Sequence, residues 1–535
     1  MLNRCVNCGG LLNYDIPTGQ LKCESCDSMF DPEKYDDETS AEENPEGRNY
    51  SVSVFTCPNC GGQISSNEAE AIEYCLYCGS FVTLTSQVES VQKPHFIMPF
   101  YKTKDDCAKS YKKMIGRKLY APKEFRDEKF ISGFKGIYIP YWTYGYEYGP
   151  DVNLDGEIET RKGDYVYRQH YSINVQTKGE LDGIYYDASS SFDDEISSRI
   201  TPFDTKKLKP FKSSYMFGFY GDTADIPANT YHDLAAEVAR TEIWEEVARK
   251  PEVDEKNPKI LLGKDFDNAF HLKERKYLSM LPVWFLTWRN KDRVAYSVVN
   301  GESGAIYSEV PVDVKRYLLF SLIFAIPIFM LLNVLFTFNA ANMLTISVIL
   351  SLLMSVMYSV QLDKIVRKQF HSDDRGYLLK HKDSKKEANK IKDNFVLSVL
   401  SEIGEAFKDG LLQDLGFGGV ALVLILVFSL IGFVVWGLLI VAVAVLVYFF
   451  IRIGKNAKLL KDGSVWGDVI GTIIALILGS LMLLADPAGD ELYYIAAIIC
   501  ACGVGLTAIF TMKRYNKLAT RPLPHFFDRK KGGEE

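Results

Sequence analysis

The spacing of apolar positions divides the chain into two halves at about Tyr317. Before this residue, apolar and polar residues alternate over short distances, as they do in soluble domains. After it, long apolar runs are separated by short charged segments, and ~20 apolar residues are enough to cross the hydrocarbon core of a bilayer. The runs cover residues 317–337, 341–360, 417–450, 465–485 and 492–512. The pattern predicts a soluble N-terminal half and a multi-pass membrane C-terminal half.

The number of spans depends on residues 417–450, a run long enough for one tilted helix or two short ones. Basic residues follow this run at 452–461 and recur in the tail at 513–535, whereas the loop at 486–491 is acidic. Two passes through 417–450 place every basic segment on one side of the membrane, as the positive-inside rule requires. We therefore predict six spans with both termini cytoplasmic; a single tilted helix would give five.

A polar, basic segment at 362–413 separates the second predicted span from the third. Its second half predicts an amphipathic cytoplasmic helix, because four apolar residues spaced at helical intervals share one face. These residues are Ile391, Phe395, Val399 and Ile403.

The predicted spans have no Lys, Arg, Glu or His in their interiors, and Asp468 lies near the end of one. Transporters normally carry ionisable residues within the membrane, so a transporter or channel component is the alternative and not the leading interpretation. A Gly-x-x-x-Gly step at Gly467 and Gly471 predicts close helix packing, either within one chain or in a homo-oligomer.

The region 94–313 predicts an α+β domain with an antiparallel sheet. Helical periodicity at 103–119 places Cys107, Tyr111, Met114 and Ile115 on one side, and a second amphipathic helix is predicted at 231–250. Between them, a stretch rich in aromatic and β-branched residues is broken by Gly and Asp-Gly turns, which is typical of antiparallel strands. The last part predicts a hairpin around Asn300 and Gly301. Aromatic residues at period two indicate core positions; an exposed peptide-binding surface is the alternative.

Two segments of this domain share an apolar-Pro-x-Trp pattern followed by extended aromatic residues: "IPYWTYGY" at Ile139–Tyr146 and "LPVWFLTW" at Leu281–Trp288. The similarity could record a duplication. It could also mean two edge strands with the same packing solution, and we favour this second interpretation.

Cysteine usage indicates a metal. Eight of the eleven cysteines lie in the first 78 residues as Cys-x-x-Cys pairs, and the spacing of the first four is repeated 52 residues later. Two facing pairs supply the four soft ligands of a tetrahedral Zn²⁺ site, and a unit of about thirty residues needs such a metal to fold. The predicted ligands are Cys5, Cys8, Cys23 and Cys26 for one site, and Cys57, Cys60, Cys75 and Cys78 for the other.

Each Cys-x-x-Cys turn needs a residue that tolerates positive φ after its second cysteine. Gly9, Gly61 and Gly79 meet this need, and Asp27 is an acceptable substitute. A thioredoxin-like redox pair would require one pair within a βαβ pattern, which the sequence lacks. Because cysteine fills all four positions of each site, no open coordination position is left for catalysis, and we predict two structural zinc ribbons.

Charge argues against nucleic acid as the partner of these ribbons. Residues 1–95 hold five basic and fifteen acidic residues, whereas nucleic-acid affinity comes mostly from Lys and Arg at phosphates. The acidic linker between the ribbons predicts a flexible tether. We expect the ribbons to contact proteins; the alternative is that they only cap the next domain.

No catalytic constellation is present. The seven histidines show no metalloprotease spacing, and the sequence lacks a Walker-A loop, a Gly-x-Ser-x-Gly elbow and a Gly-x-Gly-x-x-Gly motif. The acidic run Asp193–Glu195 predicts a solvated loop, and Cys107, Cys500 and Cys502 predict packed thiols. We therefore expect that the protein is not an enzyme.

The paired ribbons and several later stretches together resemble a bacterial family of TFIIB-type zinc-ribbon membrane proteins, sometimes labelled replication-restart helicase-like. The stretches include "IMPFYKTKDDCAKSYKKMI", "GFKGIYIPYWTYGYEYGPDVNLDGEIE", "ITPFDTKKLKPFKSSYMFGFYGD" and "LPVWFLTWRNKDRVAYSVVNGESGAIYSEVPV". The resemblance covers roughly residues 1–335 and does not extend to the membrane region after Asp363. It implies the eight cysteine ligands above and no catalytic residues. It also implies partners, since some members are encoded beside phage-shock-protein-A-like and flotillin-type (SPFH) proteins.

The predicted architecture is multidomain: two small zinc ribbons, an α+β cytoplasmic domain with antiparallel sheet, and an all-α transmembrane region of about six helices. Its segments are ribbon 1 (1–30), an acidic linker (31–52), ribbon 2 (53–85), the α+β domain (94–313), a transmembrane hairpin (317–361), the basic segment with its amphipathic helix (362–413), four further spans (417–512) and a basic cytoplasmic tail (513–535). The predicted function is a non-enzymatic scaffold that recruits cytosolic proteins to the inner membrane in envelope stress. A transporter or channel component is the alternative, and nucleic-acid binding is the least favoured.

Overall fold

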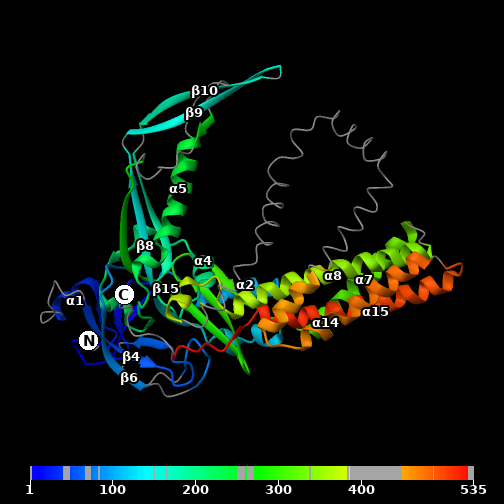
Figure 1. The fold of residues 1–535 in the computed structure, drawn as a ribbon. Coiled ribbons are helices and arrows are strands. Elements are labelled where there is room, and N and C mark those ends of the chain that lie inside the picture. Colours follow the sequence, from blue (N-terminus) through cyan, green and yellow to red (C-terminus); the bar gives the residue numbers. More distant parts are fainter. Residues whose placement is uncertain are drawn as a thin grey trace.

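A computed structural model shows a mixed α/β body, a long two-stranded arm and a bundle of apolar helices (Figure 1). It describes residues 3–39, 49–66, 74–81, 85–149, 151–163, 165–176, 178–249, 259–261, 270–335, 339–381, 385, 447, 449–485 and 487–527. The strands are β1 (Leu12–Asp15), β2 (Gln20–Cys23), β3 (Met29–Phe30), β4 (Asn49–Thr56), β5 (Gln63–Ser66), β6 (Thr85–Gln92), β7 (Phe96–Ile97), β8 (Lys135–Tyr148), β9 (Asp151–Lys162), β10 (Tyr165–Gln176), β11 (Gly179–Asp187), β12 (Lys209–Pro210), β13 (Tyr220–Gly221), β14 (Lys259–Leu261), β15 (Lys273–Asn290), β16 (Arg293–Asn300), β17 (Ile306–Ser308) and β18 (Arg521–Pro522). The helices are α1 (Pro32–Thr39), α2 (Lys104–Gly116), α3 (Glu128–Ile131), α4 (Asp194–Ile200), α5 (His232–Arg249), α7 (Val314–Leu335), α8 (Ala340–Gln369), α9 (Arg375–Lys380), α14 (Ser464–Ala485) and α15 (Asp490–Leu518).

The largest sheet of the body has twelve strands and is built around two long antiparallel neighbours, β8 and β15. Strands β4, β5 and β6 of the second ribbon region belong to this same sheet. Helices α2 and α5 lie where the sequence periodicity predicts them, and Cys107, Tyr111 and Ile115 of α2 are buried. The predicted hairpin around Asn300 is also present, formed by β16 and β17. The α+β character with antiparallel strands is therefore confirmed.

The two Pro-x-Trp segments lie at the centre of the sheet, so the edge-strand interpretation is wrong. Met280 pairs with Pro140, and Pro282 pairs with Tyr138. A proline in a central strand normally costs a ladder hydrogen bond. Here each proline lies where the outer neighbour changes: β8 passes from β13 to β11 at Pro140, and β15 passes from β7 to β16 at Pro282. The missing N–H therefore interrupts no ladder.

The surroundings of the two segments match, which supports the duplication interpretation. The indole N–H of Trp142 donates to the carbonyl of Ile226 at 2.7 Å, and that of Trp284 donates to Lys102 at 2.8 Å. The carbonyl of Pro140 accepts from the Ala188 amide, as that of Pro282 accepts from Gly301. Each half contributes a short strand, a helix, a long strand and a return strand: β7, α2, β8 and β11 in the first half, and β13, α5, β15 and β16 in the second. The two halves exchange their short strands. Strand β7 of the first half pairs with β15 of the second, and β13 of the second pairs with β8 of the first.

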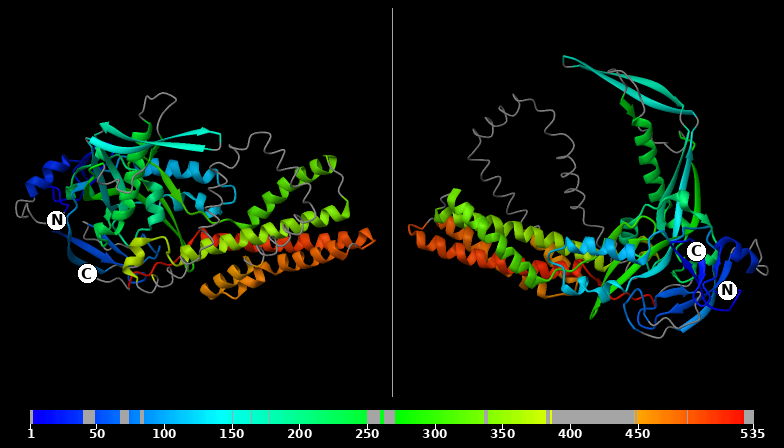
Figure 2. Two further views of the ribbon diagram at one scale, coloured as in Figure 1. Left: turned by 45° about the horizontal axis from the view of Figure 1, so that its top comes forward. Right: turned by 180° about the vertical axis from the view of Figure 1, so that it is seen from behind.

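The arm is the antiparallel pair β9–β10, with β14 added along part of β9. Twelve paired residues per strand, at ~3.4 Å per residue, make it about 40 Å long. Figures 1 and 2 show that it projects from the body and bends toward the side on which the helical bundle leaves.

Among the described residues, four helices are long and apolar enough to cross a membrane: α7, α8, α14 and α15. They agree with four of the six predicted spans. The run at 417–450, which was predicted to hold the other two, lies outside the described residues except for Val447 and residues 449–450, as does the predicted amphipathic helix at 391–403. The described residues therefore show four candidate spans, and the two passes predicted within 417–450 fall outside them.

Two predicted boundaries need correction, because α8 and α15 continue beyond the apolar runs to Gln369 and Leu518. The polar ends are stabilised by buried ion pairs: Arg452 with Asp363 at 3.0 Å, and Arg514 with Asp468 at 2.6 Å. The predicted close contact at Gly471 is made within the chain. A Cβ atom there would lie 2.7 Å from the carbonyl oxygen of Gly503 on α15.

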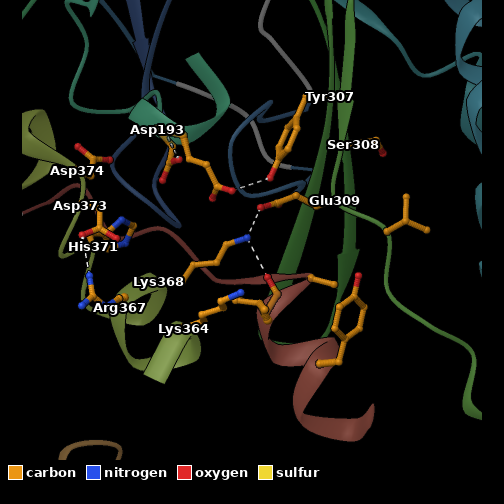
Figure 3. A pocket seen from close by; sticks show the side chains of 15 residues that line it. Asp193, Tyr307, Ser308, Glu309, Lys364, Arg367, Lys368, His371, Asp373 and Asp374 are labelled. Carbon is orange, nitrogen blue, oxygen red and sulfur yellow. Dashed lines mark hydrogen bonds and ion pairs between the residues drawn. The ribbon is translucent and has the colours of Figure 1, made fainter. Parts of the chain in front are cut away.

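The C-terminal tail, predicted as a separate basic segment, is built into the body. Strand β18 pairs with β16, and the buried guanidinium of Arg521 forms ion pairs with Asp193 and Glu309. Lys368, at the end of α8, pairs with the same Glu309 at 2.5 Å (Figure 3). These contacts attach the ends of α8 and α15 to the domain. They also correct the prediction for Asp193–Glu195, which is not a free solvated run.

Candidate metal centres

The structure brings the eight predicted cysteines together in the two predicted sets of four. In the first set, the Sγ atoms of Cys5 and Cys26 lie 3.7 Å apart, and those of Cys8 and Cys23 lie 3.5 Å apart. In the second set, both the Cys57–Cys78 and the Cys60–Cys75 distances are 3.7 Å. In each set, all four sulfur atoms lie within 4.8 Å of one another.

The backbone of each turn explains why the sulfur atoms converge. The amide after each second cysteine donates to the carbonyl of the first cysteine of the turn, at 2.8 to 3.1 Å, in all four turns. The residue that follows each second cysteine has a positive φ: 74° at Gly9, 57° at Asp27, 73° at Gly61 and 66° at Gly79. The conformational requirement predicted for these four positions is confirmed.

The donor sets fit a tetrahedral metal. Zn–S bonds of about 2.3 Å place the four sulfur atoms of a tetrahedron about 3.8 Å apart. The four measured separations of 3.5 to 3.7 Å are close to this value. Four cysteines at this spacing would hold one ion and leave no coordination position for a substrate, so the arrangement can stabilise structure and cannot activate a bound water.

Local hydrogen bonds favour the thiolate form that a metal requires. At Cys26, hydrogen bonds with the hydroxyl and with the amide of Ser28 lower the pKa of the thiol to about 6. At Cys57, a hydrogen bond with Cys60 and another with Cys75 lower the pKa to about 7. In the second cluster, hydrogen bonds with Cys57, Cys60 and Cys75 also hold the pKa of Cys78 well below its usual range.

The second cluster is part of the core of the body. Cys57, Cys60, Cys75 and Cys78 are all buried, and they pack among residues of β8, β15 and β16. The hydroxyl of Tyr296 donates to the carbonyl of Tyr77 at 2.6 Å. On the other side, the amide of Phe526 donates to the carbonyl of Cys60 at 2.5 Å. The metal turns are therefore fixed between the central sheet and the C-terminal tail.

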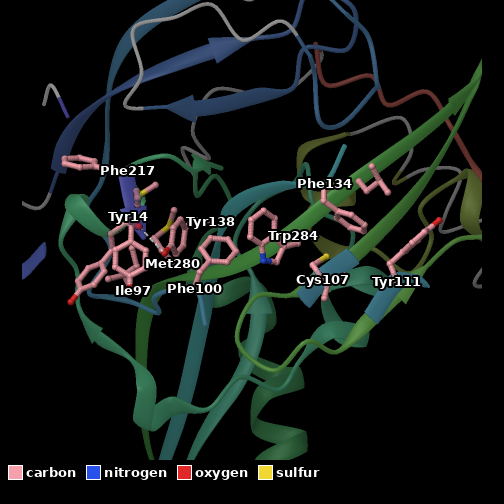
Figure 4. Close-up of a cluster of buried hydrophobic side chains, with 14 of the residues drawn as sticks. Tyr14, Ile97, Phe100, Cys107, Tyr111, Phe134, Tyr138, Phe217, Met280 and Trp284 are labelled. Carbon is pink, nitrogen blue, oxygen red and sulfur yellow. Dashed lines mark hydrogen bonds between the residues drawn. The ribbon is translucent and has the colours of Figure 1, made fainter. Parts of the chain in front are cut away.

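The first cluster lies at the edge of the body. Cys5 and Cys23 are buried, whereas Cys8 and Cys26 are exposed. The three-stranded sheet β1–β2–β3 contacts the body through Tyr14, whose ring lies 5.5 Å from that of Tyr215 and whose amide donates to the carbonyl of Phe217 at 3.0 Å (Figure 4). One face of this ribbon is packed, and the face that carries Cys8 and Cys26 is open.

Both ribbons therefore pack on the α+β domain, which is the arrangement of the capping alternative. The prediction of a freely tethered pair is wrong for the described part, because α1 also packs on the body: the Tyr35 ring lies 5.8 Å from Phe217. Residues 40–48 of the predicted linker lie outside the described residues.

One further group of metal-ligand side chains was not predicted. Asp193, His371 and Asp374 each place one ligand atom within 4.8 Å of the other two. Asp193 was interpreted as part of a solvated acidic run, and the histidines were judged by their spacing in sequence. No local signal could have found this group, because 178 residues separate Asp193 from His371.

Comparison with known proteins gives a distant relative. The chain is 22% identical over 344 residues to an uncharacterized protein, YdjG, of Bacillus subtilis (strain 168), and the match covers 58% of this chain and 90% of YdjG. No family model matches the chain. No solved structure matches it.

Proposed function

We propose that the protein is a non-enzymatic, membrane-anchored scaffold that recruits cytosolic proteins to the inner membrane, with two structural Zn²⁺ ions stabilising its cytoplasmic body. The cysteine geometry supports the metal part of the proposal. Elemental analysis of the purified protein should give two zinc ions per chain.

The charge distribution of the helices supports a cytoplasmic body. Basic residues lie at the ends of the helices nearest the body, namely Lys315 and Arg316 of α7, Lys364, Arg367 and Lys368 of α8, and Lys513, Arg514 and Lys517 of α15. At its other end, α15 begins with Asp490 and Glu491. This asymmetry follows the positive-inside rule if the body and both termini are cytoplasmic.

The β9–β10 arm is the observation that carries the scaffold proposal. A hairpin that is supported only by the three residues of β14 gains little stability by extending this far from a core, so its length favours a role in contact with another molecule. Tyr165, Val166 and Tyr167 at its tip have 73%, 49% and 54% of their surfaces exposed, and Tyr171 is exposed as well. Exposed aromatic side chains of this kind anchor protein interfaces.

Solvent exposure distinguishes the tyrosines of this arm from those of the central sheet. Tyr138 and Tyr144 lie on one face of β8 and Tyr141 on the other, and all three are fully buried because both faces of this strand are covered. Of the two strands, β10 of the arm presents its tyrosines to solvent, which supports the peptide-binding alternative for the arm and not for β8. By the family resemblance, phage-shock-protein-A-like and SPFH proteins are the partners to test first.

The test is co-purification in mild detergent with these two kinds of protein from the same genome. The double variant Tyr165→Ser plus Tyr167→Ser should reduce recovery of the partner at least tenfold. Val88→Ser on β6, a residue 77% exposed and away from the arm, is the matched control and should leave recovery unchanged. Equal recovery with all three proteins, with membrane insertion intact, would count against recruitment by the arm.

A channel or transporter is less well supported by the described part of the membrane region. Its buried ionisable residues, Asp363 with Arg452 and Asp468 with Arg514, are paired with each other near the helix ends that attach to the body. Paired charges at this depth are explained by helix packing and do not require a transported ion.

A further inference from the structure

A cavity of about 490 Å³ lies where the membrane helices meet the body. It is bounded by the end of α8, the segment from α8 to α9, strand β17 and the end of α15 (Figure 3). Asp193, His371 and Asp374 line one side of it; Asp193 precedes α4, whereas His371 and Asp374 lie three residues apart in the segment between α8 and α9. This group of three side chains is separate from both cysteine clusters, and the proposed scaffold function does not depend on it.

Local structure holds the three side chains in place. Asp193 is the N-cap of α4, and its Oδ1 accepts from the Glu195 amide at 3.0 Å. Asp374 is the N-cap of α9, and its Oδ1 accepts from the Tyr377 amide at 2.7 Å. His371 has a φ of 48°, and its ring stacks on that of Tyr377 with 3.9 Å between centroids. The ligand atoms are therefore positioned by the backbone of two helix starts and by one stacked ring.

One polar atom of this group, Nδ1 of His371, is shielded from solvent and has no hydrogen-bond partner among the described residues. Buried polar atoms are nearly always satisfied, so an unpartnered imidazole nitrogen beside two carboxylates indicates a ligand that supplies positive charge.

The charge balance points the same way. The cavity is lined by five carboxylates and three basic side chains, and Arg521 adds a fourth cation by pairing with Asp193 and Glu309, so the carboxylates outnumber the basic side chains by one. The carboxylates are those of Asp193, Glu195, Glu309, Asp373 and Asp374, and the basic residues of the lining are Lys364, Arg367 and Lys368. A buried excess of negative charge is costly unless it is compensated, and a divalent cation is a compact way to compensate it.

We propose that Asp193, His371 and Asp374 form a binding site for a divalent cation of the Mn²⁺ class. One imidazole and two carboxylates suit such an ion, whereas the cysteine clusters select a thiophilic one, so the two kinds of site would not compete. The cation would link the end of membrane helix α8 to α4 of the cytoplasmic body. The site thus makes the junction between membrane and body dependent on a metal.

The test uses the full chain in detergent with its cysteine clusters loaded with zinc. Free Mn²⁺ is measured by its paramagnetic resonance signal during titration with MnCl₂. The wild-type protein should bind about one Mn²⁺ per chain, and Mn²⁺ should raise its unfolding temperature. Asp374→Asn should weaken Mn²⁺ binding at least tenfold, and because Asn caps a helix as well as Asp does, α9 should remain intact.

Asp373→Asn is the matched control, since Asp373 is the adjacent residue and lies outside the group of three. It should bind Mn²⁺ like the wild type. His371→Phe gives a second variant that keeps the stacked ring on Tyr377 and removes the nitrogen ligand, and it should also lose Mn²⁺ binding. The proposal is overturned if the wild type shows no saturable Mn²⁺ binding, or if Asp374→Asn and His371→Phe both bind as Asp373→Asn does.

Discussion

The two cysteine clusters have the same spacing, the same hydrogen bonds in their turns and nearly the same sulfur separations, yet they occupy different environments. The second is buried within the core and is contacted by the central sheet and by the C-terminal tail. The first is packed on one face only, with Cys8 and Cys26 open to solvent. The comparison teaches that an identical metal turn can be part of a domain's core or an attachment at its edge, depending on the residues around it.

The largest expected difference comes from removing metal ligands. Cys57→Ser plus Cys60→Ser should abolish the folded body, because a structural zinc site contributes nominally ~10–16 kcal/mol and this one also anchors β15, β16 and the tail. Size-exclusion chromatography in detergent should show loss of monodisperse protein. This variant cannot test recruitment by the ribbon, since the whole domain would be lost with it.

Cys5→Ser plus Cys8→Ser is the counterpart in the first cluster. We expect the main unfolding transition to survive, with limited proteolysis now cutting within residues 3–39. The reason is that the first ribbon packs on the body through one face only and lies outside the twelve-stranded sheet. If both double variants lost the body equally, the distinction between a core cluster and an edge cluster would be wrong.

The next largest effect concerns the tail that covers the second cluster. Phe526 is 5% exposed and its ring lies 5.7 Å from that of Tyr77, whereas the adjacent Phe527 is 57% exposed. Phe526→Ala should lower the free energy of unfolding by about 3 kcal/mol, the lower end of the range for a buried phenylalanine. Phe527→Ala should change it by less than about 0.5 kcal/mol. Thermal unfolding in detergent, followed by tryptophan fluorescence, would measure both, and a similar loss for the two variants would contradict the docking of the tail.

The features predicted correctly from the sequence are those fixed by residues close together in the chain. The four cysteine turns require glycine or aspartate at one position, and Gly9, Asp27, Gly61 and Gly79 show this directly. The apolar face of α2 follows from helical spacing, and four candidate spans follow from the length of their apolar runs. In each case, the deciding physical requirement acts within one turn, one helix or one run.

The features that were missed depend on residues far apart. The segments around Pro140 and Pro282 were interpreted as edge strands. Nothing close to them in sequence shows that β13 stops pairing with β8, and β7 with β15, just before these prolines. Phe526 looked like part of a basic tail, although it packs against a cysteine turn more than four hundred residues earlier. The Asp193–His371–Asp374 group was missed for the same reason, because the fold alone brings Asp193 to His371 and Asp374.

The smallest expected effect gives the most closely matched comparison, between Gly9→Ala and Gly61→Ala. The two glycines hold the same position in their turns and have φ values of 74° and 73°. An alanine in this left-handed conformation costs about 1–2 kcal/mol, and that cost is common to both. A Cβ atom on Gly9 would meet nothing within 4 Å, whereas one on Gly61 would lie 2.8 Å from the backbone nitrogen of Phe527. Crowding of this kind costs roughly 1–3 kcal/mol more. Thermal unfolding of the two variants should therefore show the larger destabilisation for Gly61→Ala, and the difference measures how tightly the tail holds the second cluster. Equal destabilisation would mean that the tail yields freely, and that the two clusters differ in burial but not in how firmly they are held.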